Sequence, residues 1–80
     1  MRVSVEIGDY REPENNKPQE VEIYCDKEGL EYLIKELSKL KNNGDHAHFM
    51  TPSWGMNDLS ENKFVAKNDL VHHLKLTLIE

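Results

Sequence analysis

The chain has 80 residues, and its 15 acidic and 10 basic residues give a formal net charge of −5 at pH 7. A chain of this length has room for one small domain built around one core. The acidic balance disfavours a nucleic-acid-binding protein, because such proteins concentrate Lys and Arg on one surface.

Membrane and disulfide-rich classes are disfavoured as well. Cys25 is the only cysteine, so no internal disulfide forms. The first residues alternate apolar and polar and lack the apolar run of a signal peptide. No stretch approaches the roughly 20 apolar residues of a membrane span. We therefore predict a cytoplasmic protein with a single domain, residues 1–80, and no membrane partner.

Two strands are predicted before the first helix. Residues 2–7 (RVSVEI) alternate apolar and polar, which is typical of a half-buried strand. Residues 8–19 are polar and include two prolines, so they predict a loop, with a partner-contacting role left open. Residues 20–25 (EVEIYC) alternate again. Three of them are expected to point into the core, and the others outward: Val21, Ile23 and Cys25 inward; Glu20, Glu22 and Tyr24 outward.

One amphipathic helix follows the second strand. Asp26 has the side chain of a helix N-cap, and Gly44 is expected to take the left-handed conformation that closes a helix. Between them, apolar residues recur at helical spacing and predict one stripe packed on the sheet. These residues are Leu30, Leu33, Ile34, Leu37 and Leu40.

The second half of the chain predicts further strands. Residues 45–50 (DHAHFM) form one that ends before Pro52, because proline cannot donate to a β-ladder. Residues 63–66 (KFVA) are compatible with a short strand, and residues 70–80 (LVHHLKLTLIE) form the clearest one. His72 on the last strand is expected to be partly buried and hydrogen-bonded.

The order of elements is β-β-α-β-(β)-β. It predicts an α+β fold with one mostly antiparallel sheet of four to five strands and a single amphipathic helix on one face. One helix covers only one face of such a sheet, so the opposite face is expected to be wet.

Three histidines are candidates for a site on the open face: His46, His48 and His73. If their strands are neighbours, the imidazoles converge, and Asp45 adds a carboxylate, as in some zinc and iron sites. However, neither a four-ligand spacing nor a second shell accompanies them. We therefore expect no metal and no cofactor. A small metal-binding or hydrolytic domain built on this His-x-His strand is the alternative.

Ser53 and Trp54 bear on whether the protein is an enzyme or a binding protein. Ser53 has no base at a readable spacing, and the four scattered glycines form no phosphate loop, so we predict that the protein is not an enzyme. Trp54 is compatible with a plug over the core or with a binding hot spot, because Trp and Tyr dominate interface energetics. In the second case, Tyr24, His46 and His48 would surround it.

Three segments together resemble the immunity protein 32 family, predicted small α+β immunity proteins of bacterial polymorphic-toxin systems. They are residues 45–55 (DHAHFMTPSWG), residues 58–60 (DLS) and residues 70–80. The resemblance covers residues 21–80, with the first segment the most specific. The family's tryptophan is usually followed by two glycines, whereas Gly55 is followed here by Met56.

The resemblance implies a non-enzymatic protein that binds and blocks a cognate toxin made by its own cell. The acidic balance suits a basic toxin, because opposite charges speed association. A self-associating module that pairs through an edge strand, as in a homodimer, is a further alternative. The residues expected to bind the partner are Trp54, His46, His48, Tyr24, Glu20, Glu22 and His73.

Overall fold

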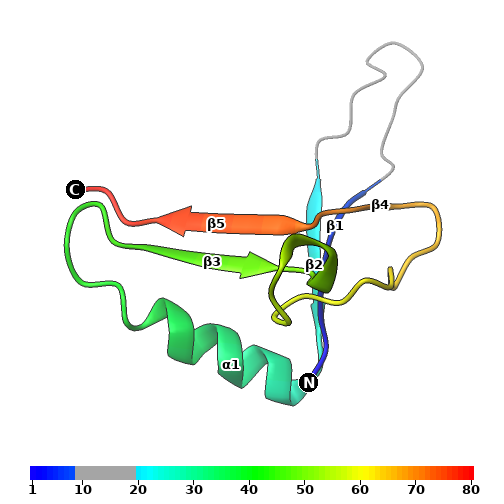
Figure 1. Ribbon diagram of the computed structural model, residues 1–80, viewed down its shortest axis with the longest axis horizontal. Helices are drawn as coiled ribbons and strands as arrows, with labels where there is room; N and C mark the ends of the chain where they lie inside the picture. Colours follow the sequence, from blue (N-terminus) through cyan, green and yellow to red (C-terminus); the bar gives the residue numbers. More distant parts are fainter. Residues whose placement is uncertain (9–19) are drawn as a thin grey trace, which may run out of the picture.

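The computed structural model describes residues 1–8 and 20–80, and the predicted loop at residues 9–19 lies outside them. The described part contains one α-helix and five strands, which confirms the α+β class and the predicted order (Figure 1). The elements are β1 (Val3–Ile7), β2 (Val21–Cys25), α1 (Lys27–Leu37), β3 (His46–Met50), the 3-10 helix η1 (Pro52–Trp54), β4 (Asp69–Leu70) and β5 (His73–Thr77).

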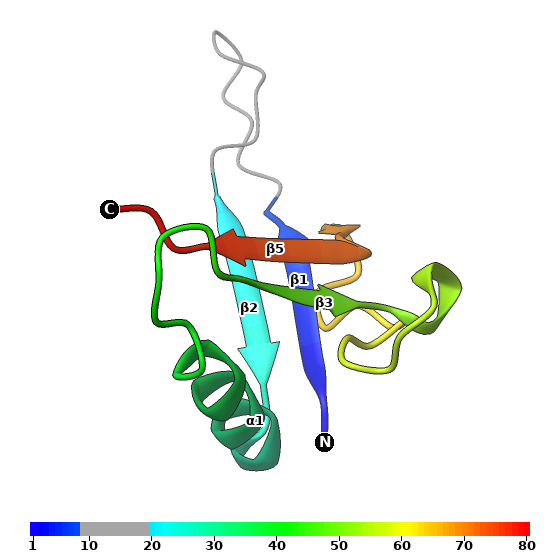
Figure 2. The same ribbon diagram turned by 60° about the vertical axis from the view of Figure 1, so that its left-hand side comes forward.

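The strands lie in two antiparallel sheets, whereas a single sheet was predicted. Sheet A has the order β2-β1-β4, and sheet B pairs β3 with β5. Figure 2 shows β3 and β5 crossing in front of β1 and β2, and α1 lies on this same side of sheet A. Sheet B and α1 together therefore cover one face of sheet A. Within the described residues, no helix is long and apolar enough to cross a membrane.

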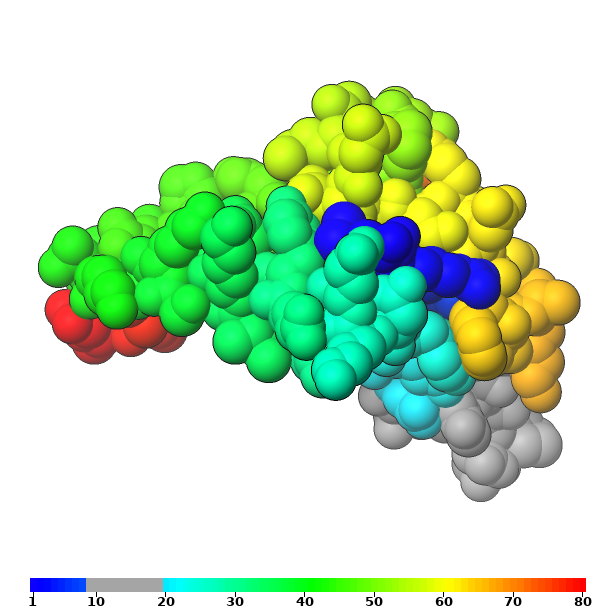
Figure 3. Space-filling view, turned by 90° about the horizontal axis from the view of Figure 1, so that it is seen from below, coloured from blue at the N-terminus to red at the C-terminus, as the bar shows by residue number. Residues whose placement is uncertain are grey.

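The central strand β1 is buried on both faces. Val3 and Val5 form the core with Phe49 and Leu59. Their neighbours on the opposite face, including Ser4, are equally buried, so the predicted wet face of the sheet is wrong at this strand. Residues 60–68 cover that face, and Figure 3 shows them beside the N-terminus, with α1 on its other side.

The carboxylate of Glu6 holds this covering segment in place. The hydroxyl of Ser4 donates a hydrogen bond to the Glu6 carboxylate. The same carboxylate accepts hydrogen bonds from the N–H groups of Phe64 at 2.6 Å and Val65 at 3.2 Å and from the side-chain amide of Asn68 at 2.9 Å. Burial raises the pKa of Glu6, but these hydrogen bonds outweigh burial and lower it from 4.5 to about 2. The strand predicted at residues 63–66 is absent, because these N–H groups bind a carboxylate instead of a neighbouring strand.

The start of α1 agrees with the sequence, but its end does not. Asp26 is its N-cap, and the Asp26 carboxylate accepts a hydrogen bond of 2.7 Å from the N–H of Gly29. The helix ends at Leu37 with Ser38 as its C-cap, so the predicted closure at Gly44 is wrong, and Leu40 of the predicted stripe lies beyond the helix. Gly44 does have the predicted left-handed conformation, with a φ of 92°.

The apolar stripe of α1 is only partly in the core. Leu33 and Leu37 pack against the core, whereas Leu30 and Ile34 are exposed, so the prediction is wrong for these two. The reason is the buried Gly29, where a Cβ atom would lie only 2.6 Å from the carbonyl oxygen of Arg2, the residue before β1. The helix approaches sheet A most closely at this glycine, and the flank with Leu30 and Ile34 turns outward.

The two faces of β2 are buried in the reverse of the predicted sense. Val21 is 63% and Ile23 48% exposed, although they share a face with the buried valines of β1. Glu22 and Tyr24 are instead half-buried. Phe64 stacks on Tyr24 with ring centroids 4.6 Å apart, which explains why the predicted outer side is covered.

Replacing Gly29 by alanine is expected to destabilise the protein. Alanine favours a helix over glycine by about 1 kcal/mol, but overpacking of a close contact costs about 1–3 kcal/mol. Urea unfolding measures the difference, with Glu31→Ala on the exposed side of α1 as the control. Equal or greater stability of Gly29→Ala would refute the close approach.

The Glu6 carboxylate should make stability depend on pH. Because its pKa falls from 4.5 to about 2 on folding, its contribution is fully present above pH 4.5 and is lost as the pH falls towards 2. A shift of this size corresponds to on the order of 3 kcal/mol. Urea unfolding of Glu6→Gln between pH 2 and 7 should show a lower stability at pH 7 and a flatter profile. A profile parallel to that of the wild type would contradict this assignment.

A candidate binding surface of histidines and Trp54

The outer face of sheet B brings the three candidate histidines together. In the β3–β5 register, His48 lies opposite Lys75 and His73 lies opposite Met50. Residues opposite each other and their diagonal neighbours share one face, so His46, His48 and His73 lie on it together. The convergence expected from the alternating sequence is therefore present.

These imidazoles form a continuous row with the indole of Trp54, which we call the His–Trp row. The ring centroids of His46 and His48 are 4.7 Å apart, and those of His48 and His73 are 5.0 Å apart. Trp54 follows at 5.8 Å from His73. Trp54 is 57% exposed, so the interpretation of this residue as a core plug is wrong. The row is a surface feature.

A hydrogen bond between two imidazoles fixes the middle of the row. Nδ1 of His48 and Nε2 of His73 are 2.8 Å apart. One of these nitrogens must carry the proton and the other must accept, so at least one ring is neutral. Burial, and then the nearby His46, His73 and Lys75, lower the pKa of His48 from 6.5. The neutral form of His48 is therefore favoured.

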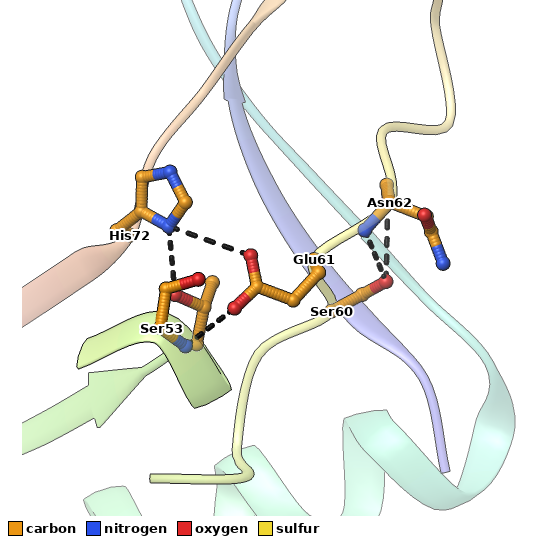
Figure 4. Close-up of polar contacts among 6 residues, drawn as sticks. Ser53, Ser60, Glu61, Asn62 and His72 are labelled. Carbon is orange, nitrogen blue, oxygen red and sulfur yellow. Dashed lines mark hydrogen bonds and ion pairs between the residues drawn. The ribbon is translucent and has the colours of Figure 1, made fainter. Parts of the chain in front are cut away.

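A polar network positions the turn that carries Trp54 (Figure 4). The N–H of Ser53 donates to Glu61. Nδ1 of His72 lies 2.7 Å from the hydroxyl oxygen of Thr51 and 3.8 Å from the carboxylate of Glu61. The indole of Trp54 stacks on the ring of His72 with an interplanar angle of 10°. His72 is half-buried and hydrogen-bonded, as predicted, and its ring contacts the exposed indole of Trp54.

The same network does not have the arrangement of a hydrolase. Thr51, His72 and Glu61 have the residue types of a nucleophile, a base and an acid. Both oxygens approach Nδ1 of His72, whereas a catalytic triad places its two partners on different ring nitrogens. Thr51 is also fully buried, away from any substrate. The network is suited to holding the turn.

Asp45 is bound by the main chain of the turn before β3. The Asp45 carboxylate accepts hydrogen bonds of 2.9 Å from the N–H groups of Lys41 and Asn42, which lowers its pKa. Within residues 1–8 and 20–80, no group of three or more His, Cys, Asp or Glu side chains is arranged to hold a metal ion. The alternative of a His-x-His metal domain gains no support from this geometry.

The remaining candidate residues lie on sheet A, apart from the row. Glu20 and Glu22 belong to the β2 segment, and the hydroxyl of Tyr24 donates to Glu22 at 2.7 Å. The guanidinium of Arg2 lies 5.4 Å from the ring centre of Phe64, which stacks on Tyr24. A pocket of about 270 Å³ opens here, lined by Arg2, Tyr24, Cys25, Asp26 and Phe64. The predicted partner-binding residues therefore form two surfaces.

Sequence reasoning missed the residue that connects α1 to the row. Asp58 is buried and accepts hydrogen bonds from the hydroxyl of Tyr32 and the N–H of Met50. The first of these bonds, followed by burial, raises the pKa of Tyr32 to about 12. The only signal for Asp58 was its place in the family-like DLS segment, because its partner on the helix is 26 residues away.

Acidification is expected to disturb the row. Because the pKa of His48 is lowered on folding, the unfolded chain takes up a proton first, and stability should fall as the pH drops below 6.5. An NMR titration of the ring should find the pKa of His48 below 6.5. In His46→Gln it should move upward, because one neighbouring charge is removed. A His48 that titrates at 6.5 or above in the wild type would contradict this description.

Comparison with known proteins identifies the family of the chain. A family model described as Immunity protein 32 matches residues 20–75. No curated protein and no solved structure gives a significant match to the chain. The matched range includes β2, α1, β3 and every residue of the His–Trp row. Because the match extends over well more than half of the sequence, the chain belongs to the immunity protein 32 family.

Proposed function

We propose that the protein neutralises a cognate toxin by binding it, without catalysing a reaction. Membership of the immunity protein 32 family supports a toxin as the class of partner. The observation that carries the proposal is Trp54, an exposed indole on a turn held by its own hydrogen-bond network. The proposal puts the action in the cytoplasm of the bacterium that makes the toxin, as part of a polymorphic-toxin system.

Trp54 has the properties of an interface anchor. Tryptophan is enriched among residues whose truncation weakens binding most, because it buries a large apolar area. The stacking on His72 and the bonds to Glu61 hold the turn before a partner arrives, which lowers the entropy lost on binding. His46, His48 and His73 extend the contact surface with rings that both stack and hydrogen-bond.

Charge supports a basic toxin. The chain carries a net charge of −5, and opposite charges raise association rates in a salt-dependent way. Glu20 and Glu22 lie on sheet A rather than in the row. Their expected contribution is therefore to the rate of capture or to a second contact, and Trp54 is expected to govern dissociation.

Trp54→Ala tests the proposal directly. Binding to the toxin domain encoded beside its gene is expected to weaken by about 2 kcal/mol or more. The melting temperature should change little, because the indole is exposed. Ile79→Ala removes an exposed apolar side chain outside the row and should bind normally.

Titration calorimetry and thermal melting on the same samples separate the outcomes. If the wild-type protein binds no toxin, the proposed function is refuted. If a folded Trp54→Ala variant binds with normal affinity, Trp54 and the His–Trp row are not the binding surface.

A further inference from the structure

The outer edge of β2 has no strand partner in the part of the chain that the structure describes, because β2 pairs only with β1. The carbonyl groups of Val3 and Val5 accept hydrogen bonds from the N–H groups of Ser60 and Val71, which lie on the β4 side of β1. Backbone groups alternate in direction along a strand, so Glu22 and Tyr24 are the residues of β2 that bond to β1. The N–H and C=O groups of three residues consequently point outward: Val21, Ile23 and Cys25.

The side chains of these residues are also accessible. Val21 is 63% and Ile23 48% exposed, and Cys25 is exposed as well. Leu30 and Ile34 add further exposed apolar side chains on α1, which begins directly after β2. A row of outward main-chain groups with apolar side chains at alternate positions is what an added β-strand recognises.

The other face of β2 determines which strand fits. Glu20 and Glu22 lie on it, and Asp26 follows the strand, so an incoming strand meets carboxylates. Opposite charges across a strand pair are favourable, and like charges are unfavourable. A second copy fits less well, because two-fold pairing centred on Ile23 sets Glu20 of each copy opposite Asp26 of the other. Each copy also carries a net charge of −5.

We propose that the free edge of β2 captures an extended segment of the toxin, with apolar residues at alternate positions and Lys or Arg between them. The segment becomes the fourth strand of sheet A. This inference rests on the proposed function and deepens it, because it names the chemistry of the bound segment. It adds a main-chain contact to the side-chain contacts of the His–Trp row.

Amide hydrogen exchange tests the pairing residue by residue. In the free protein, the amides of Val21, Ile23 and Cys25 should exchange fast, and those of Glu22 and Tyr24 slowly. In the saturated complex with the toxin domain encoded beside the gene, the first three should become slow. Unchanged exchange at these three amides would overturn the proposal, whatever the affinity.

Ile23→Pro tests the same edge by binding. Proline is tolerated on an edge strand when the lost N–H faces solvent, so the fold should persist. Losing one inter-strand hydrogen bond should weaken binding about fivefold or more, whereas Ile23→Val keeps the N–H and should bind normally. If Ile23→Pro does not fold, the amide exchange of the wild-type complex tests the strand addition instead.

The outcomes of these experiments are distinguishable from a failure of the proposed function. Toxin binding that is weakened by Trp54→Ala and unchanged in a folded Ile23→Pro variant removes only the strand addition. A wild-type dimer that becomes a monomer in Ile23→Pro, by sedimentation, assigns the edge to a second copy and overturns the proposal. A wild-type protein that binds no toxin removes both inferences.

Discussion

A buried carboxylate connects the two halves of this small fold. Glu6 lies on the central strand of sheet A and binds Phe64, Val65 and Asn68, which follow it by about 60 residues. These bonds pin the segment that leads into β4 and from there into β5. Sheet B, and with it the His–Trp row, is therefore placed over sheet A by the paired carboxylate together with the packing of Phe49 in the core.

The two proposed contact surfaces are presented in different ways. The His–Trp row displays side chains on a turn braced by His72 and Glu61. The edge of β2 displays main-chain groups, with Val21 and Ile23 beside them. Side chains at a rigid turn give specificity through shape, whereas main-chain pairing adds affinity with little dependence on sequence. A protein of this size gains a larger interface by combining them.

Local features of the fold were predictable from the sequence. The alternation at β3 and β5 placed His46, His48 and His73 on one face, and Asp26 marked the start of the helix. Each of these features depends on neighbours in sequence or on a period of two or 3.6 residues. Such patterns require no knowledge of distant partners.

Features that depend on distant partners were not predictable. Alternation placed Val21 and Ile23 in the core, but their burial depends on how far sheet B and α1 extend over β2. The direction of α1 follows from the contact between Gly29 and the N-terminal strand, which helical periodicity does not contain. The role of Glu6 is likewise invisible, because an acidic residue in an alternating strand normally indicates a solvent-facing position.

The way Glu6 holds its partners has a consequence for evolution. Two of its four partners are the backbone N–H groups of Phe64 and Val65, which every amino acid except proline supplies. The bonds to Glu6 therefore place no demand on the side chains at these two positions, and the remaining constraint on Phe64 is its stacking on Tyr24. Under the proposed function, the protein must follow changes in the toxin that it binds. A surface segment anchored through its main chain provides variable positions without endangering the fold.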